Sequence, residues 1–333
     1  MLQYIFKLPN WLLIKFSGKK LIEIGKRALH PPYQLLLKLN ENAAVDYDSI
    51  TPEEFRSTFS QGIFPKKLPK DITWKDHKIN VDGSSIKIRE YQPPVKEEKS
   101  PALIYFHGGG WVIGDIDSHH ELTASLCKKL GVKVFSVDYR LSPEYKFPIP
   151  LNDCNSAFDW VVSNANDLGV DAERVSVGGD SAGGNLSACL CLLRKSESSP
   201  MPKSQLLIYP VTNLSSMDTD SYEECEEGFY LSKKSMEWFR GHYLNSNEER
   251  TDPLCSPLLA EDLTGHPPAV VTTAGFDPLR DEGYEYSEKL RKYGVSVSYI
   301  EYPGYIHGFA SMGFIPGTDE ALEELCTELS RHI

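Results

Sequence analysis

The sequence predicts an α/β protein with a mostly parallel sheet and helices on both faces. From about residue 72, short apolar runs rich in β-branched residues alternate with helical patterns, which is typical of parallel sheets. The length of 333 residues suits one large domain or two modest ones, and 41% hydrophobic residues allow a sizeable core. The apolar runs are 102–106, 132–137, 174–177, 206–209, 269–273 and 297–302.

Two more strands and two irregular regions complete this organisation. Asp82-Gly83 is a hairpin signal, so we expect strands at 77–81 and 86–91 on either side of it. Residues 1 to about 70 have helical patterns. Residues 211–247 interrupt the alternation with acidic and aromatic side chains, which indicates an insertion.

The composition indicates which classes of partner and which cellular compartment to expect. The formal net charge is −12, and this argues against nucleic acid, because phosphates require a positive face. The seven cysteines are odd in number and contain no C-x-x-C pair. This favours a reducing compartment over a disulfide framework, and we expect a cytoplasmic location.

Apolar residues near the start of the chain raise the question of a membrane segment. Residues 11–14 are apolar, but Lys15 interrupts them and Lys19 and Lys20 follow. The run is far shorter than the ~20 residues that a spanning helix needs, so we predict no stable membrane span. An amphipathic helix that covers a pocket or touches a lipid surface remains open.

The strongest candidate for chemistry is a serine between two glycines. Gly179-Asp180-Ser181-Ala182-Gly183 follows a predicted strand and precedes an apolar helix. A sharp strand-to-helix turn of this kind exposes a serine hydroxyl and leaves no room for side chains beside it. Ser181 is therefore the candidate nucleophile, and the amide of Ala182 is a candidate donor to an oxyanion. The alternative is an ordinary glycine-rich turn.

A second glycine cluster follows the strand at 102–106. In His107-Gly108-Gly109-Gly110-Trp111, consecutive glycines allow backbone amides to converge and a substrate to approach. A phosphate-binding loop is the alternative, but neither glycine cluster satisfies G-x-G-x-x-G and no lysine completes a P-loop. Gly108, Gly109 and Gly110 are therefore candidates for the second oxyanion donor.

A serine nucleophile needs a base and a carboxylate that orients the base. His307 follows the last predicted strand, and Asp277 follows the strand at 269–273. Asp281 and Glu282 are rivals of Asp277, but we expect them inside the next helix. The order Ser181, Asp277, His307 is typical of one class of hydrolase. We predict no metal site, and the adjacent His119 and His120 face different directions on a helix.

The motifs together resemble the hormone-sensitive-lipase-like esterases of the α/β-hydrolase fold. The match runs from about residue 72 to the end of the chain. The residues that carry it are 107–111, 138–144, 179–184, 256–260, 277–283, 302–304 and 307–309. His120 stands where the family commonly has aspartate, and His266 stands where leucine is common.

The resemblance implies a fold and a division of the chain. It implies an eight-stranded hydrolase sheet under a helical cap, with residues 1–70 and 211–247 as the two cap pieces. Residues 71–210 and 248–333 would form the catalytic core. It also implies that two of the three loop glycines donate to the oxyanion together with Ala182.

The function expected from this resemblance is hydrolysis of short to medium acyl carboxylic esters through an acyl-enzyme, without any cofactor. Trp111 and Asp180 are candidate substrate-binding residues, although a purely structural Trp111 is nearly as plausible. An amidase or deacetylase with the same triad and a non-catalytic ligand receptor are the alternatives. A small-molecule ester is the expected partner, and a second copy in a homodimer remains open.

The first 60 residues carry apolar side chains at helical spacing, among them Phe6, Leu12, Leu13 and Phe16. We expect this segment to pack over the mouth of the active site. Deletion of residues 1–40 should then leave a folded but less stable core with altered acyl preference. Ordinary core packing and a membrane-surface anchor are the alternatives.

Overall fold

The computed structural model describes residues 2–41, 45–61, 68–95 and 98–333. An eight-stranded sheet runs through the molecule in the order β10-β9-β8-β7-β5-β6-β4-β3. The strands from β10 to β6 are parallel, whereas β4 is antiparallel to both β6 and β3. The strands are β3 Thr73–Val81, β4 Ser84–Gln92, β5 Ser100–Phe106, β6 Lys133–Asp138, β7 Val170–Asp180, β8 Gln205–Ile208, β9 Ala269–Phe276 and β10 Val297–Ile306. The predicted α/β-hydrolase sheet is confirmed.

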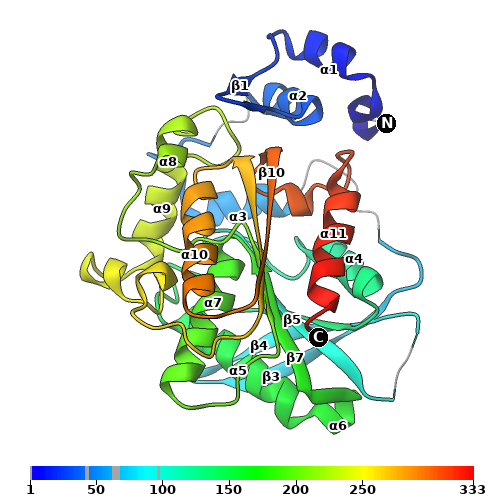
Figure 1. Cartoon of the computed structure of the whole chain (residues 1–333), viewed down its shortest axis with the longest axis vertical. Coiled ribbons are helices and arrows are strands. Elements are labelled where there is room, and N and C mark those ends of the chain that lie inside the picture. Colours follow the sequence, from blue (N-terminus) through cyan, green and yellow to red (C-terminus); the bar gives the residue numbers. More distant parts are fainter. Residues whose placement is uncertain (1, 42–44, 62–67, 96–97) are drawn as a thin grey trace.

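Helices cover both faces of the sheet, with α7 and α10 on one side and α4 and α11 on the other (Figure 1). Every residue of β5 and β9 is buried as a result, which explains why these strands read as continuous apolar runs. The helices of this core are α4 His120–Leu130, α5 Ile149–Ser163, α6 Ala165–Leu168, α7 Ala182–Ser196, α10 Arg280–Lys292 and α11 Thr318–Ser330. Short 3-10 turns are η3 Glu248–Thr251, η4 Pro257–Leu259 and η5 Phe309–Ser311.

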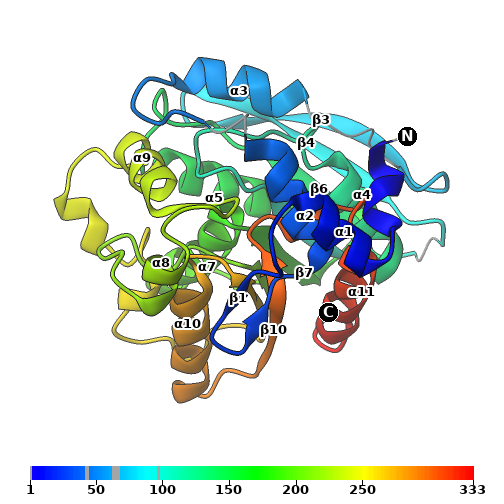
Figure 2. The ribbon, with the colours of Figure 1, turned by 90° about the horizontal axis from the view of Figure 1, so that it is seen from above.

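The N-terminal segment lies at the end of the sheet where β10 ends, as the side and top views agree (Figures 1 and 2). It contains η1 Leu2–Lys7, α1 Asn10–Ser17, the hairpin strands β1 Glu23–Ile24 and β2 Arg27–Ala28, α2 Pro31–Asn40 and α3 Pro52–Gln61. The hairpin is a departure from the helical patterns expected there. The amide of His30 donates to the carbonyl of Gly304 (2.8 Å), and the Tyr33 ring packs on Tyr305 (5.2 Å between centroids).

The predicted insertion forms two helices, α8 Asp220–Glu224 and α9 Lys233–Tyr243. Helix α9 begins with a capping box in which Ser232 and Ser235 bond each other's backbone amides. Aromatic rings connect α9 to α3, because Phe55 stacks on Phe239 with 6.0 Å between ring centroids. The insertion and the N-terminal segment therefore contact each other as well as the core.

Candidate active site

Ser181 sits in a strained turn between β7 and α7. Its backbone has φ 56° and ψ −117°, a region that residues other than glycine rarely occupy. A side chain on Gly179 would lie 2.4 Å from the carbonyl oxygen of Phe106, and one on Gly183 would lie 1.8 Å from the same oxygen. The glycines of the motif are therefore required by the close approach of β5.

Three side chains from separate parts of the chain meet at this turn. His307 Nε2 lies 2.9 Å from Ser181 Oγ, and His307 Nδ1 lies 2.7 Å from Asp277 Oδ2. The amide of Leu279 donates to the other oxygen of Asp277 (2.9 Å). Ser181 is 7% exposed, His307 6% and Asp277 0%, so this hydrogen-bonded series is almost removed from solvent.

The two rival carboxylates have other partners. Asp281 accepts the amide of Ser221 (2.8 Å) and pairs with Arg280 (2.7 Å). Glu282 accepts the amide of Thr212 (2.6 Å), and burial raises its pKa to about 8. Both belong to α10, as expected, and they hold α8 and the chain after β8 on that helix. Asp277 is the carboxylate that the fold brings to His307.

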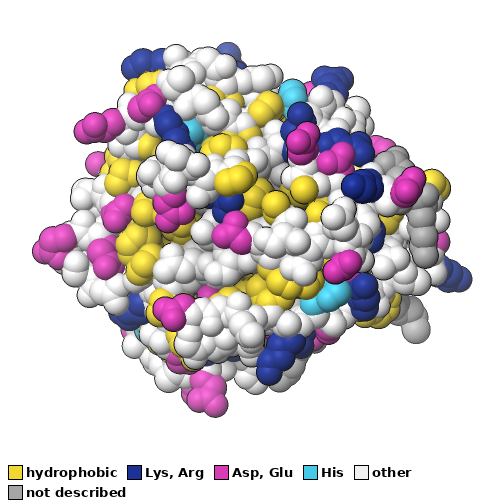
Figure 3. Space-filling view, turned by 90° about the horizontal axis from the view of Figure 1, so that it is seen from below, with side chains coloured by type: hydrophobic (Ala, Val, Ile, Leu, Met, Phe, Trp, Pro, Cys, Tyr) yellow, Lys and Arg dark blue, Asp and Glu magenta, His cyan; other side chains and the backbone are white. Residues whose placement is uncertain are grey.

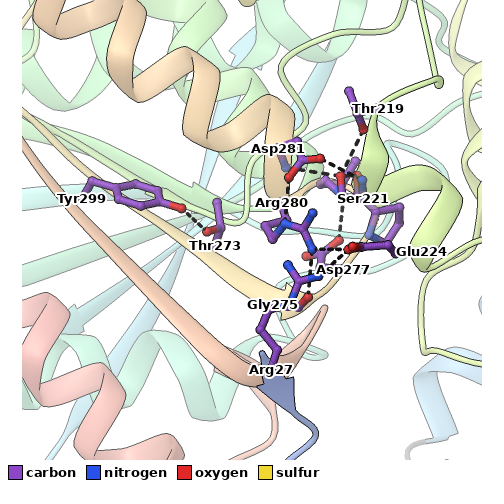
Figure 4. Close-up of polar contacts among 12 residues, drawn as sticks. Arg27, Thr219, Ser221, Glu224, Thr273, Gly275, Asp277, Arg280, Asp281 and Tyr299 are labelled. Carbon is purple, nitrogen blue, oxygen red and sulfur yellow. Dashed lines mark hydrogen bonds and ion pairs between the residues drawn. The ribbon is translucent and has the colours of Figure 1, made fainter. Parts of the chain in front are cut away.

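A network of charges beside Asp277 joins three segments that are distant in sequence (Figure 4). Arg280 Nη1 lies 2.7 Å from Glu224 Oε2, and Arg27 pairs with the same carboxylate. The hydroxyl of Ser221 donates to the carbonyl of Pro278 (2.7 Å). The hairpin, α8 and the start of α10 thus converge next to Asp277. Sequence reasoning missed Arg27 and Glu224, and no motif around them signals this contact.

The glycine loop is held by the carboxylate of Asp180. The amide of Gly108 donates to Asp180 Oδ1 (3.0 Å), and Tyr105 donates its hydroxyl to the same atom (2.8 Å). Burial opposes ionisation of Asp180, but His119 and these hydrogen bonds outweigh it and hold the pKa below its usual range. Asp180 is 4% exposed, and its carboxylate supports the glycine loop through the amide of Gly108.

Trp111 packs in the core of the fold. Its side chain is fully buried, and its ring stacks on Tyr243 with 4.2 Å between centroids. The ring that meets the glycine loop is instead Phe239 of α9. A Cβ on Gly110 would lie 2.2 Å from Phe239, so this ring rests directly on the glycine. Phe239 lies in no motif, and only the fold reveals its position.

A cavity with a volume of about 460 Å³ lies beside the residues that follow the glycine loop. Arg56, Gly114, Asp138 and Tyr145 are among its lining residues, and the triad is not. Arg56 of α3 donates to the carbonyls of Val112 and Ser142, each at 2.7 Å. This cavity therefore lies between α3 and the core, which Arg56 connects, and it is distinct from the serine site.

Metal ligands, disulfide bonds and membrane-spanning helices were also predicted to be absent. The part of the chain that the structure describes holds no cluster of His, Cys, Asp or Glu suited to a metal ion. All seven cysteines are buried free thiols. No helix among the described residues is long and apolar enough to cross a membrane.

Residues 103–311 match a family model described as the alpha/beta hydrolase fold, and the chain belongs to this family. A carboxylic ester hydrolase, LipN, of Mycobacterium tuberculosis is 37% identical over 95% of this chain and 87% of its own length. An ethyl acetate hydrolase of Pseudomonas putida is 38% identical over 76% of this chain and 80% of its own.

Solved structures agree with these relatives. A thermostable esterase from Pseudomonas putida has a TM-score of 0.87 and 33% identity, and the match covers 93% of this chain and 99% of that one. The predicted resemblance to the hormone-sensitive-lipase-like esterases is confirmed.

Proposed function

We propose that this protein is a serine carboxylesterase with Ser181 as nucleophile, His307 as base and Asp277 as the orienting acid. The hydrogen-bonded series from Asp277 through His307 to Ser181 carries the proposal. The names of the relatives support ester hydrolysis as the reaction. The substrate class is short to medium acyl carboxylic esters, and no cofactor is needed.

The mechanism follows from this geometry. Ser181 Oγ attacks the ester carbonyl while His307 Nε2 accepts its proton, and Asp277 stabilises the imidazolium that forms. His307 then protonates the leaving alcohol, so the serine ester of the acid remains. His307 accepts a proton from water, which attacks this acyl-enzyme, and then returns the proton to Ser181 Oγ as the carboxylic acid leaves.

The oxyanion is held by the amides of Gly109, Gly110 and Ala182. The amide of Gly108 already donates to Asp180, so it is not a donor to the oxyanion. Gly109 and Gly110 have φ values of 118° and 58°, which glycine adopts without strain. In this proposal Asp180 and Trp111 hold the glycine loop in position and do not bind substrate, because Asp180 accepts the amide of Gly108 and Trp111 stacks on Tyr243.

The cap consists of parts of residues 1–70 and 211–247, and it limits access of water to the site. The contact of Phe239 with Gly110 and the low exposure of Ser181 and His307 support this role. Exclusion of water strengthens the electrostatic contacts of an oxyanion. The seven buried thiols support a reducing cytoplasm as the location.

A panel of p-nitrophenyl esters and matched anilides tests the proposal. We expect rapid hydrolysis of the short esters, slow or no hydrolysis of the anilides, and loss of several powers of ten in turnover for Ser181→Ala. Circular dichroism must show that the variant is folded. Turnover of the variant within tenfold of wild type would refute Ser181 as nucleophile, and preference for anilides would favour the amidase.

A further inference from the structure

Three large aromatic side chains point into solvent on the first two helical segments. Tyr4 is 59% exposed, Trp11 65% and Phe16 52%. Exposed lysines accompany them, and we call the set of Tyr4, Lys7, Trp11, Lys15, Phe16 and Lys20 the N-terminal surface. Three aromatic side chains that are each more than half exposed within a stretch of 13 residues indicate a candidate interaction site.

The buried side of this segment is formed by other residues than those aromatic ones. The opposite side of η1 and α1 is already packed in the core, with Phe6 1% exposed and Leu13 fully buried. Gln34 of α2 donates to the hydroxyl of Ser17 (2.7 Å) and so ties α1 to α2. The exposed face of α1 is therefore presented on a rigid support.

The charge of this segment is opposite to that of the remaining chain. Residues 1–41 contain seven lysine and arginine residues and two glutamates, so their net charge is +5. Because the whole chain has a net charge of −12, the remaining residues have a net charge of −17. Among the described residues, Lys7, Lys15 and Lys20 have no ion-pair partner, in contrast to Lys19, which pairs with Glu41 (3.0 Å). On the opposite end of the molecule, basic and acidic side chains are interspersed (Figure 3).

Basic residues interleaved with tryptophan, tyrosine and phenylalanine match the chemistry of an anionic membrane interface. Lysines are attracted to acidic headgroups, and amphipathic aromatic rings settle at the level of the headgroups. An acidic protein partner would also attract the lysines, but it would not explain why aromatic rings are exposed beside them. The acidic remainder of the chain would be repelled, which orients the molecule.

The N-terminal surface lies at the catalytic end of the fold. Ser181, Asp277 and His307 follow the carboxyl ends of β7, β9 and β10, and α1 and α2 lie over that same end (Figure 2). His30 bonds to Gly304, three residues before His307. A bilayer that contacts α1 would therefore face the cap and the active site.

We propose that the N-terminal surface docks this protein reversibly on an anionic lipid bilayer, and that its substrates include esters dissolved in that bilayer. The statement about substrates rests on the proposed esterase function, whereas the docking does not. An ester substrate would enter from the lipid phase past α2, which lies beside α1 over the same end of the sheet (Figure 2).

Vesicle co-sedimentation of the full chain tests the docking. We expect binding to phosphatidylcholine vesicles that contain phosphatidylserine, little binding without it, and loss of binding in about 1 M salt, where the Debye length is about 3 Å. K7E/K15E/K20E should lower the partition coefficient at least ~100-fold, since each basic residue near the surface contributes roughly a factor of five. W11S/F16S should lower it several-fold. K78E/K87E/K203E makes the same charge change elsewhere and should bind better than K7E/K15E/K20E by more than tenfold.

Activity and assembly measurements separate the possible outcomes. All variants should hydrolyse soluble p-nitrophenyl acetate like wild type, whereas hydrolysis of a long-chain ester in anionic vesicles should fall in K7E/K15E/K20E. Equal vesicle binding by the two lysine variants would overturn the docking. So would a wild-type dimer, in sedimentation velocity, that K7E/K15E/K20E converts to monomers. Vesicle binding without any ester hydrolysis would refute the esterase and leave the docking in place.

Discussion

Asp277 and Asp281 are close in the sequence, but their side chains have different partners. Asp277 is fully buried against His307, whereas Asp281 binds the amide of Ser221. Asp277→Asn should lower turnover by about 10⁴-fold, as in a serine protease where the amide stabilises the wrong tautomer. Asp281→Asn should lower it less than about tenfold. Steady-state kinetics with one soluble ester compare the two, and the reverse ranking would make Asp281 the acid.

His266 is a buried histidine outside the active site. It is 6% exposed, neither ring nitrogen has a hydrogen-bond partner among the described residues, and burial lowers its pKa to about 4. The unfolded chain therefore binds a proton more readily than the folded one, so stability is complete above about pH 6.5 and is lost as the pH falls toward about 4.

His266→Leu should stabilise the protein, because leucine has no buried polar atoms and cannot bind a proton. We expect a gain of ~1–2 kcal/mol in the free energy of unfolding at pH 8 and a further ~1–2 kcal/mol at pH 5. Urea unfolding at both pH values measures the difference. His107, whose burial also lowers its pKa to about 4, remains in the variant and preserves part of the acid sensitivity. An identical gain at the two pH values would contradict the proton linkage.

At the scale of elements, α9 and the glycine loop form one unit through Phe239 and Gly110. Removal of the ring in Phe239→Ala should open space beside the amide of Gly110 and favour longer acyl groups. Because each buried methylene contributes about 0.8 kcal/mol, kcat/KM for a hexanoyl ester relative to an acetyl ester should rise on the order of tenfold. The ratio within one variant cancels differences in active concentration.

Trp238→Ala provides the matched control for this prediction. Trp238 belongs to the same aromatic cluster, with 5.3 Å between its ring centroid and that of Phe239, but Phe239 is the ring that rests on Gly110. Its loss should weaken the cluster without changing the acyl preference. A similar shift in both variants would mean that general loosening of the cap, and not the Phe239 ring, sets the preference.

For the whole molecule, the N-terminal segment is part of the hydrophobic core. Its buried side chains pack with those of η5 and α11, and they are Phe6, Leu13, Leu29, Tyr33, Leu35 and Leu36. At ~1.5–3 kcal/mol each, their burial contributes on the order of 10 kcal/mol, which is comparable to the total stability of a typical domain. Deletion of residues 1–40 is therefore expected to prevent folding, whereas the sequence had led us to expect a folded core.

Expression of the truncated chain, followed by size-exclusion chromatography and near-ultraviolet circular dichroism, measures this outcome. W11S/F16S is the control, because it changes two side chains of the same segment that are more than half exposed. It should unfold at the same temperature as wild type. A monomeric truncated protein with cooperative unfolding would restore the earlier expectation of a dispensable cover.

The sequence by itself determined the strands of the large sheet, the turn at Ser181 and the order of the three candidate catalytic residues, but not the hairpin β1–β2. These features depend on local sterics and on hydrophobic periodicity, which neighbouring residues record directly. Tertiary structure alone decided that Asp180 accepts a hydrogen bond from the amide of Gly108, that Trp111 is buried and that Phe239 packs on Gly110. It also brought Arg27 to Glu224 across 197 positions. Such contacts join residues whose meeting depends on how whole elements pack, and no local pattern in the chain encodes them.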